Sequence, residues 1–524
     1  MSTLLQRAQL ALRHDLLAAI VVFLVALPLC MGIAIASGAP PAAGLITGIV
    51  GGLVVGAIAG APLQVSGPAA GLAVVVYEIV QEHGLGTLGV VLLLAGAIQL
   101  VAGLLRLGQW FRAVSPAVIH GMLAGIGVLI LVSQFHVMVD DAPRGSGVRN
   151  ILALPEAVWK GVMPVDGSAH HWAAGIGLLT IAVIVGWKAL APKKLQVVPA
   201  TLLAVAVATV VAAASGVAVR LVDVPDSIAS AVTLPTVDAL RSLLSGPVVV
   251  AAVGMAFVAS AETLLCATAV DKMHTGARTK YDRELAAQGV GNMICGGLGA
   301  LPMTGVIVRS AANVEAGARS RASAILHAFW LLVFVAALPW VLKMIPTASL
   351  AALLVFTGFK LVNLKVVREL RQYGRGEVVI YVATMVTIVA TDLLTGVLTG
   401  VGLSAVKLLY GFAHLDVRVK AEPGRGATVM YLDGAATFIR LPKLAAALER
   451  VRASTELHVH FEHLRYVDHA CLELLMNWKK QHEATGGQLV IDWEEFTARF
   501  RAPASARRSR EVVRTEAREL QPVS

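Results

Sequence analysis

Long apolar runs recur along the first four-fifths of the chain, separated by short polar or proline-containing segments. A helix needs about 20 apolar residues to cross the hydrocarbon layer of a bilayer. Leu16–Ser37 is the first such run, and Val248–Val270 is another that only Glu262 interrupts. With shorter runs included, the pattern predicts about fourteen crossings. The expected spans are residues 16–37, 42–60, 66–76, 88–105, 116–135, 172–190, 197–217, 248–270, 285–300, 305–316, 322–341, 348–362 and a helical pair within 378–412, with loops at 140–171 and 219–245.

Two of these runs are broken in corresponding places. The glycine-rich run at 42–60 leads into Pro62, and the run at 285–300 leads into Pro302. Paired interruptions in two halves of a membrane chain indicate a central site formed by opposed half-helices near the bilayer midplane. We therefore expect half-helices at 66–76 and 305–316, with Ser66 capping the first. Small residues of the two halves match at a constant spacing of 240 residues: Gly51, Gly56 and Pro62 with Gly291, Gly296 and Pro302.

The second broken segment carries one arginine, Arg309, in an apolar stretch. An arginine at the centre of a span costs about 2.5–3.5 kcal/mol on insertion scales, so it usually faces a cavity and has a partner or a substrate. The free N–H groups and positive dipole end of a half-helix favour an anion there. The alternative is a structural arginine at a kinked helix start. The candidate anion-binding residues are Ser66, Gly67, Pro68, Ala69, Gly305, Val306, Ile307, Val308 and Arg309.

A carboxyl group, Glu262, lies in the middle of another predicted span. A buried carboxyl group without a cation nearby tends to keep its proton, so Glu262 is a candidate for proton coupling or cation binding, with a structural hydrogen bond as the alternative. Cys266 follows one helical turn later on the same face. Because sodium prefers several oxygen ligands, a thiol beside one carboxylate favours a proton over sodium as the coupling ion. Arg309 either contacts the anion or pairs with Glu262.

Composition supports a membrane protein. The 524 residues are 57% hydrophobic and 15% charged, whereas soluble domains have about 25% charged residues. The net charge of +10 comes from short loops and the C-terminal tail, where it sets topology rather than suggesting nucleic acid. Arg7 and Arg13 place the N-terminus in the cytoplasm. The cysteines and histidines have no metal-ligand spacing and no phosphate-loop motif occurs, so we expect no cofactor and no enzyme activity.

Hydropathy falls after Phe412, which we take as the end of a transmembrane domain at 1–412. Glu422–Gly426 is typical of a linker, which we place at 413–427. Alternating strand-like and helix-like segments predict a small α/β domain at 428–500. The basic remainder, 501–524, is expected to be disordered.

Three stretches resemble a known family: VSGPAAG at Val65–Gly71, ELAAQGVGN at Glu284–Asn292 and LPMTGVIVRSAANVEAGAR at Leu301–Arg319. Through them the chain resembles the SulP anion transporters, the bacterial counterparts of the SLC26 proteins. The C-terminal segment resembles a STAS domain at Tyr466–Leu475 and Thr485–Ile491. The resemblance implies a polytopic α-helical membrane protein of two inverted seven-span repeats, arranged as core and gate subdomains, with two half-helices at the midplane and a cytoplasmic STAS domain. It also implies a homodimer, elevator-like alternating access and transport of sulfate, bicarbonate, chloride or dicarboxylates.

These observations favour a proton-coupled secondary transporter of a small inorganic anion, of the sulfate or bicarbonate type, in the lipid bilayer of the inner (plasma) membrane. The alternatives are a sodium-coupled bicarbonate symporter, an anion exchanger, and an anion-binding sensor or scaffold that signals through the STAS domain to a cytoplasmic protein. Regulated STAS domains have Asp-Ser-Ser-Gly where this chain has Asp468-His469-Ala470-Cys471. Because no hydroxyl group is present in that motif, a phosphorylation switch there is not expected.

Overall fold

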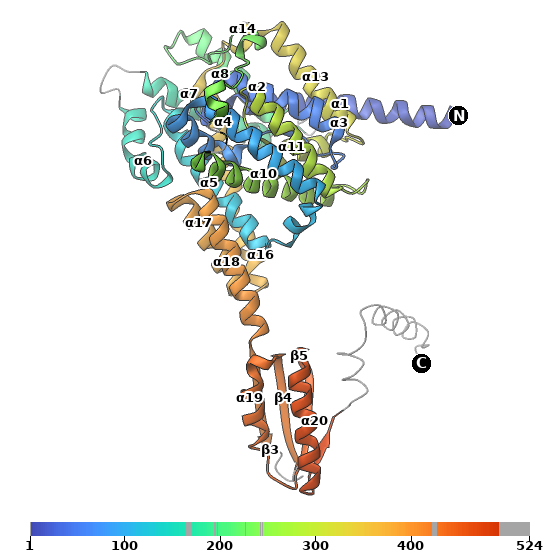
Figure 1. Cartoon of the computed structure of the whole chain (residues 1–524). Coiled ribbons are helices and arrows are strands. Elements are labelled where there is room, and N and C mark those ends of the chain that lie inside the picture. The colour runs from blue at the N-terminus through green and yellow to red at the C-terminus, as the bar shows by residue number, and fades with distance from the viewer. Residues whose placement is uncertain are drawn as a thin grey trace. The chain divides into compact units, whose positions relative to one another are not determined.

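The computed structural model describes residues 2–163, 169–192, 195, 198–225, 227–241, 243, 245–421 and 427–491 of the chain. The chain divides into two compact units, Met1–Val401 and Gly402–Ser524 (Figure 1). Three predicted segments lie outside the described residues: the linker-like 422–426, the end of the α/β domain at 492–500, and the tail at 501–524.

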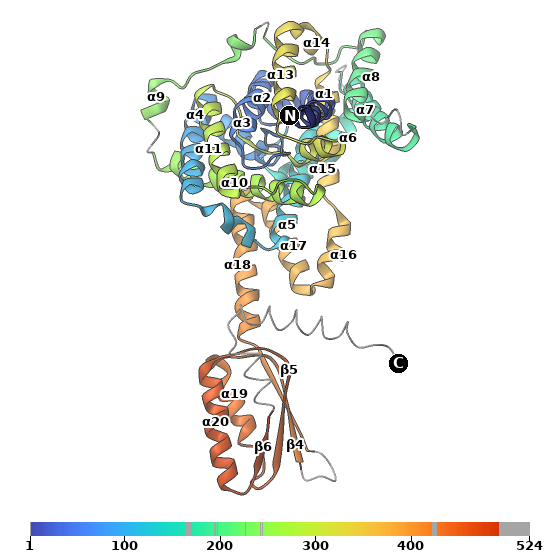
Figure 2. The same cartoon turned by 90° about the vertical axis from the view of Figure 1, so that its right-hand side faces the viewer.

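Helices form nearly all of the first unit (Figures 1 and 2). Among the described residues, eight helices are long and apolar enough to cross a membrane. The first half of the helical region contains α1 (Ser2–Ala36), α2 (Pro41–Val50), α3 (Gly56–Ile58), α4 (Ala73–Leu104), α5 (Pro116–Met138), α6 (Gly147–Val162), α7 (His170–Leu190), α8 (Ala200–Ser215) and α9 (Val237–Arg241). The second half contains α10 (Gly246–Met273), α11 (Tyr281–Gly297), α12 (Ile307–Glu315), α13 (Ala322–Ala337), α14 (Pro339–Leu342), α15 (Thr347–Leu361), α16 (Leu364–Gln372), α17 (Arg375–Ala390) and α18 (Leu393–Phe412).

A helix occurs at each predicted span. The backbone of Gly84 (φ 79°, ψ 167°) leaves the helical region and divides α4 into two segments, which correspond to the expected half-helix and the next crossing. The long run at 378–412 is the expected pair, α17 and α18, joined at Thr391 and Asp392. The described helices are therefore those of a polytopic α-helical membrane protein.

Two amphipathic elements are among those that the sequence-based prediction missed, which also include α9 in the expected loop at 219–245 and the short α16. The expected loop at 140–171 contains α6, and the expected linker at 413–427 contains strand β3 (Leu415–Ala421). Both elements are amphipathic, with apolar residues on one face only. A search for continuous apolar runs cannot detect such elements, because their apolar positions alternate with polar ones.

Glycines allow close contact between α4 and α11. A Cβ atom at Gly96 would lie 2.6 Å from the carbonyl oxygen of Gly289, and one at Gly89 would lie 2.8 Å from that of Gly296. Any larger side chain at these positions would push the two backbones apart. The glycines therefore place α11 where its polar residues can reach the broken segments.

The second unit is a four-stranded sheet with the strand order β3-β4-β5-β6 and two helices, α19 (Leu441–Leu448) and α20 (His469–Ala484). The strands β4 (Ala427–Ala436), β5 (Glu456–Val467) and β6 (Gln488–Val490) are parallel, and β3 pairs antiparallel with β4. This sheet is consistent with a STAS domain. The carboxylate of Asp468 accepts the Cys471 N–H at 2.8 Å and so caps α20.

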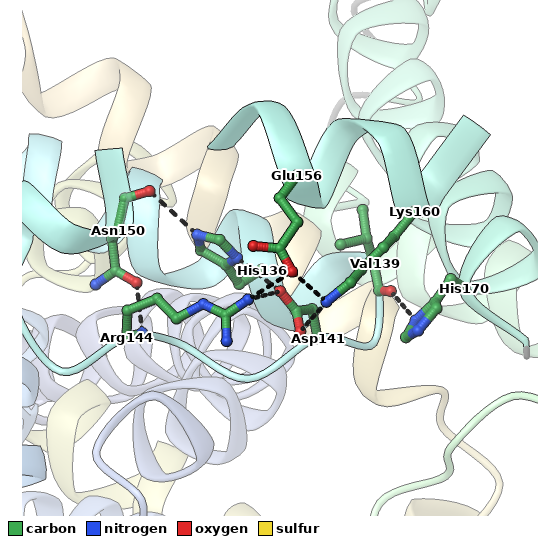
Figure 3. Close-up of polar contacts among 8 residues, drawn as sticks. All are labelled: His136, Val139, Asp141, Arg144, Asn150, Glu156, Lys160 and His170. Carbon is green, nitrogen blue, oxygen red and sulfur yellow. Dashed lines mark hydrogen bonds and ion pairs between the residues drawn. The ribbon is translucent and has the colours of Figure 1, made fainter. Parts of the chain in front are cut away.

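A polar cluster, which we call the α6 clasp, joins α6 to the end of α5 (Figure 3). Asp141 lies at its centre, with Oδ2 3.0 Å from His136 Nδ1 and Oδ1 3.3 Å from Lys160 Nζ. His136 Nε2 lies 3.2 Å from the carbonyl oxygen of Asn150. Because the carboxylate and the carbonyl only accept hydrogen bonds, His136 makes both bonds at once only with a proton on each nitrogen. Glu156 completes the cluster, at 2.8 Å from Lys160 and 3.1 Å from Arg144.

We expect Asp141→Asn to loosen the α6 clasp and to lower the free energy of unfolding by about 1 kcal/mol, since Asp141 is partly screened by solvent. Burial opposes ionisation of Asp141, but hydrogen bonds from His136 and Lys160 outweigh it and hold the pKa below the ordinary 3.8. A lowered pKa stabilises the fold above pH 3.8, and this stabilisation is lost as pH falls through the folded-state value.

Thermal unfolding of the detergent-solubilised protein between pH 3 and pH 7 measures this effect, with ~1 pH unit steps. Asp140→Asn is the matched control, because Asp140 lies outside the clasp and, in the described chain, forms an ion pair with the exposed Arg220. Equal melting temperatures for Asp141→Asn and Asp140→Asn would contradict a stabilising role for the clasp.

Candidate functional site

The two broken segments meet as a short antiparallel ribbon. Strand β1 (Ser66–Pro68) pairs with β2 (Met303–Gly305), with Ser66 opposite Gly305 and Pro68 opposite Met303. Each strand leads into a helix: β1 into a 3-10 turn and α4, and β2 into α12. The two broken segments meet, as predicted. They do so as paired strands, and the helices begin a few residues later than expected.

The polar face of α11 holds the ribbon in place. Glu284, Gln288 and Asn292 are spaced four residues apart and therefore lie along one face of the helix. The buried Glu284 carboxylate accepts hydrogen bonds from the N–H groups of Gly60 and Ala61, both at 2.8 Å. It also accepts hydrogen bonds from the side-chain amides of Gln64 at 2.8 Å and Gln288 at 3.0 Å. One carboxylate thus organises the turn that precedes β1.

The other two residues of this face bind the strands themselves. Gln288 Nε2 donates to Ser66 Oγ at 2.6 Å. Asn292 pairs with the backbone of Met303, accepting its N–H at 2.8 Å and donating to its carbonyl oxygen at 3.1 Å. Ser66 therefore does not cap a helix, contrary to the sequence-based expectation. The sequence signal for this role was three polar residues four apart in an apolar run.

The ribbon occupies several N–H groups that the sequence assigns to the anion site. The Ala69 N–H donates to the carbonyl oxygen of Pro302 at 3.2 Å, and the Val306 N–H donates to that of Val65 at 2.9 Å. The Gly305 N–H donates to Thr263 Oγ1 at 3.1 Å. Ala69, Val306 and Gly305 therefore hold the ribbon and have no N–H left for an anion.

The N–H donors that remain free in the described chain come next in each segment: that of Ala70 after Ala69, and those of Ile307 and Val308 after Val306. Among the described residues, the N–H groups of Ala70, Ile307 and Val308 have no protein acceptor, as expected in the first turn of a helix. The Val308 residue is 41% exposed, and Ile307 and Ala70 are partly exposed. The other candidates, Ser66, Gly67, Pro68 and Gly305, are buried within the ribbon.

Arg309 lies beside Gly67 of the ribbon, among α1, α2 and α13. Its residue is 0% exposed, and none of its guanidinium nitrogens has a hydrogen-bond partner among the described residues. A Cβ atom at Gly67 would lie 2.1 Å from Arg309 Nη1, and one at Gly48 would lie 2.7 Å from Cys30 Sγ and 3.9 Å from Arg309 Nη1. Glycine at position 67 is therefore required by the close approach of the guanidinium. No ion pair joins Arg309 to Glu262 in the described part of the chain.

The sequence analysis missed His327 of α13, which faces the same region. Its Nδ1 donates to the carbonyl oxygen of Ala324 at 2.5 Å, and its buried Nε2 has no partner among the described residues. A Cβ atom at Gly52, one helical turn after Gly48, would lie 2.8 Å from His327 Cε1. With a proton on Nδ1, the neutral ring carries its lone pair on Nε2. His327 thus offers a buried ring nitrogen without a described partner, in the same region as an arginine whose guanidinium nitrogens also have none.

Glu262, on α10, is the second candidate charge beside the ribbon. A Cβ atom at Gly71 would lie 3.0 Å from Glu262 Oε2, next to the first turn of the α4 segment. The hydroxyl of Thr304 also faces this carboxyl group. Neither Glu262 Oε2 nor Thr304 Oγ1 makes a hydrogen bond of normal geometry among the described residues. The thiol of Cys266 lies 3.8 Å from Ser310 Oγ, so it packs against α12.

A cavity of about 460 Å³ reaches the start of the α4 segment. Leu72 and Val75 line its inner end, and α10 and the residues around Asp392 form other walls. Its charged lining is mainly acidic, with Glu78, Glu82 and Asp392. The cavity therefore borders the 3-10 turn and the first turn of α4 that follow β1.

The fold and the paired broken helices define a multi-pass membrane transporter rather than an enzyme. A model of the sulfate permease family matches residues 12–384, and the chain belongs to that family. It is 29% identical over 424 residues to YvdB of Bacillus subtilis, named as a candidate sulfate transporter, covering 75% of this chain and 73% of that protein. It is 24% identical over 424 residues to the bicarbonate transporter BicA of Picosynechococcus sp., covering 77% and 71%.

Solved structures show the same fold. The murine anion transporter Slc26a9 in the inward-facing state has a TM-score of 0.70 and 17% identity, covering 91% of this chain and 84% of that chain. The transmembrane domain of a cyanobacterial bicarbonate transporter BicA has a TM-score of 0.60 and 24% identity, covering 74% of this chain and 97% of that chain. The predicted family and fold class are thus confirmed.

We expect Arg309→Ala to weaken anion binding at least ~10-fold, and Arg309→Lys to weaken it only ~3-fold, because a point charge behind the ribbon suffices to attract a small anion. Isothermal titration of the purified protein with sulfate and with bicarbonate measures both affinities. Arg321→Ala is the matched control, since the exposed Arg321 side chain donates to the carbonyl oxygen of Ala57. Wild-type affinity in a folded Arg309→Ala protein would make Arg309 a structural residue only.

Proposed function

We propose that the chain is a secondary active transporter that carries a small inorganic anion of the sulfate or bicarbonate type. The observation that carries this proposal is the meeting of two half-helix starts at one ribbon, with the N–H groups of Ala70, Ile307 and Val308 free of acceptors among the described residues. The names of the relatives support it, since YvdB is named as a candidate sulfate transporter and BicA as a bicarbonate transporter.

Several physical features would attract an anion to this place. The start of a helix carries roughly half a positive charge, and two such starts lie beside one ribbon. The guanidinium of Arg309 stays protonated, and no carboxylate among the described residues pairs with it. Its field therefore reaches the ribbon without neutralisation. Backbone N–H groups suit the oxygen atoms of sulfate or bicarbonate.

A proton is the coupling ion that we propose, carried by Glu262. The carboxyl group lies beside the first turn of the α4 segment, so its charge bears directly on an anion bound there. A negative Glu262 would repel the anion, and a protonated Glu262 would not. Anion binding and proton binding therefore favour each other.

Sodium coupling is the alternative, and one observation favours it. Thr304 places a hydroxyl oxygen near Glu262, which gives sodium a second oxygen ligand that the sequence analysis did not anticipate. Sodium usually requires more oxygen ligands than these two. The thiol of Cys266 and the hydroxyl of Ser310 contact each other rather than Glu262.

For the transport cycle we propose an elevator-like movement in a homodimer. Helices α4, α10 and α11 pack on one another and carry the ribbon, as a core subdomain would. Helices α5, α7, α15 and α17 pack into a second group, as a gate subdomain would. We place the protein in the inner membrane, with the N-terminus and the C-terminal unit in the cytoplasm, where that unit would bind a protein partner. Residues 1–412 would form the transport domain.

Uptake by purified protein in liposomes tests this proposal. Radiolabelled sulfate, bicarbonate and succinate are offered under an inward proton gradient, with and without a sodium gradient. Uptake of sulfate or bicarbonate driven by the proton gradient is the expected result. Binding without uptake of any of the three would favour the sensor or scaffold function, and uptake driven only by a counter-anion would favour exchange.

We expect uptake to rise as the external pH falls, because protonation of Glu262 removes a negative charge from the anion site. Replacement of external sodium by choline should have no effect. Glu262→Gln mimics the protonated form and should remove the pH dependence while keeping anion binding. Glu369→Gln, which neutralises an exposed acidic residue on α16, is the matched control. Sodium-dependent uptake that ignores pH would contradict the proton assignment.

A further inference from the structure

A cavity of about 750 Å³ lies at the connection between α10 and α11. Four basic side chains line it: Lys272 at the end of α10, Arg278 and Lys280 in the connection, and Arg283 in the first turn of α11. Two acidic residues, Asp271 and Asp282, are also part of the lining. We call this cavity the α10–α11 basic pocket. It is built by residues other than those of the ribbon and of Glu262.

Both carboxylates are engaged in building the walls. Asp271 is buried and accepts hydrogen bonds from the Thr279 hydroxyl at 2.9 Å, the Thr279 N–H at 3.2 Å and the Tyr281 hydroxyl at 3.3 Å. Asp282 accepts the N–H of Gly108 at 3.0 Å. Asp271 therefore links the two ends of the α10–α11 connection. Asp282 links this connection to the 3-10 turn after α4. Neither carboxylate forms an ion pair with Lys272, Arg278, Lys280 or Arg283 among the described residues.

The basic side chains keep free donors. Arg278 donates from Nη1 to the carbonyl oxygen of Asp271, and Arg283 donates from Nε to that of Ile58 at 2.8 Å. The other N–H groups of both guanidinium groups have no acceptor in the described chain, and the same holds for the ammonium groups of Lys272 and Lys280. The pocket thus has a surplus of positive charge and many unused donors in one concave place.

We propose that the α10–α11 basic pocket binds an anion that carries two or more phosphate groups. One tetrahedral ion is far smaller than the cavity and would reach only some of the four cations, whereas linked phosphates can contact lysines and arginines together. Arginine offers paired N–H donors to phosphate oxygens, and lysine a compact charge. Basic residues that only set membrane topology satisfy the positive-inside rule without lining a common cavity. They also do not need neighbouring carboxylates whose hydrogen bonds go to other groups.

Hydrogen bonds connect the α10–α11 basic pocket to the turn before the ribbon. Arg283 holds the carbonyl oxygen of Ile58, and the Lys280 N–H donates to the carbonyl oxygen of Gly60 at 3.3 Å. Gly60 and Ala61 form the turn that the Glu284 carboxylate organises before β1. A ligand that engages Lys280 and Arg283 would therefore act on the turn that positions the first half-helix. This inference does not depend on which anion is transported.

Binding of inorganic pyrophosphate to the full chain in phosphatidylcholine nanodiscs tests the proposal. A dioctanoyl phosphatidylinositol bisphosphate is the second probe, because the same phosphates can belong to a soluble molecule or to a lipid headgroup. We expect saturable binding of at least one probe, weakened ~10-fold or more by Lys272→Gln with Lys280→Gln. Arg278→Gln, tested alone, should weaken binding by a smaller factor. Binding of pyrophosphate identifies a soluble source, and binding of only the lipid probe identifies a headgroup.

Lys365→Gln is the matched control, since Lys365 is an exposed lysine of α16 outside the pocket. Its binding should equal that of the unmodified chain, and the melting temperature shows that each variant is folded. The proposal is overturned if neither probe binds, or if folded Lys272→Gln with Lys280→Gln and Arg278→Gln bind as tightly as the control.

Discussion

The hydrogen bonding of the ribbon between β1 and β2 is the constraint on which the rest of the structure depends. A helix broken inside a membrane leaves N–H and carbonyl groups that lipid cannot satisfy. Here the backbone groups of both breaks find partners together, because each strand supplies hydrogen-bond partners for the other. The Glu284 and Asn292 side chains bind further backbone groups of the broken segments, and Gln288 binds the Ser66 hydroxyl. The glycine contact of α4 with α11 follows from this requirement, since it brings α11 close to the ribbon.

Two opposite charges border the ribbon without forming an ion pair in the described chain. Arg309 approaches Gly67 of β1, and Glu262 lies next to Gly71. If they formed an ion pair, each would neutralise the other and neither would respond to a bound ion. Because they are not paired, the arginine contributes a constant positive field and the glutamate a charge that protonation can remove. That separation makes an ion-coupled anion site physically reasonable in an apolar interior.

Family membership and site geometry answer different questions. The match to the sulfate permease family and the shared fold establish the kind of protein. They do not select an anion, because backbone N–H groups and helix dipoles bind any small oxyanion. Val308, at the start of α12, is exposed beside the N–H groups that have no acceptor among the described residues. The α10–α11 basic pocket adds a second place where anion chemistry is expected, outside that site.

The sequence by itself determined the spans, the two breaks and the key charged residues, because apolar run length, proline and an isolated arginine have consequences that need no tertiary contact. It also indicated the α/β unit, apart from the amphipathic β3, and it missed α6 for the same reason. Only the tertiary structure decided which N–H groups remain free, since hydrogen bonds between the two broken segments, far apart in the chain, use those of Ala69 and Val306. It also decided that Ser66 accepts a hydrogen bond from Gln288, and that Arg309 approaches Gly67 without pairing with Glu262 in the described chain. Side-chain direction at a broken helix depends on the strand register and on the neighbours that the fold brings together, and neither is encoded in local sequence.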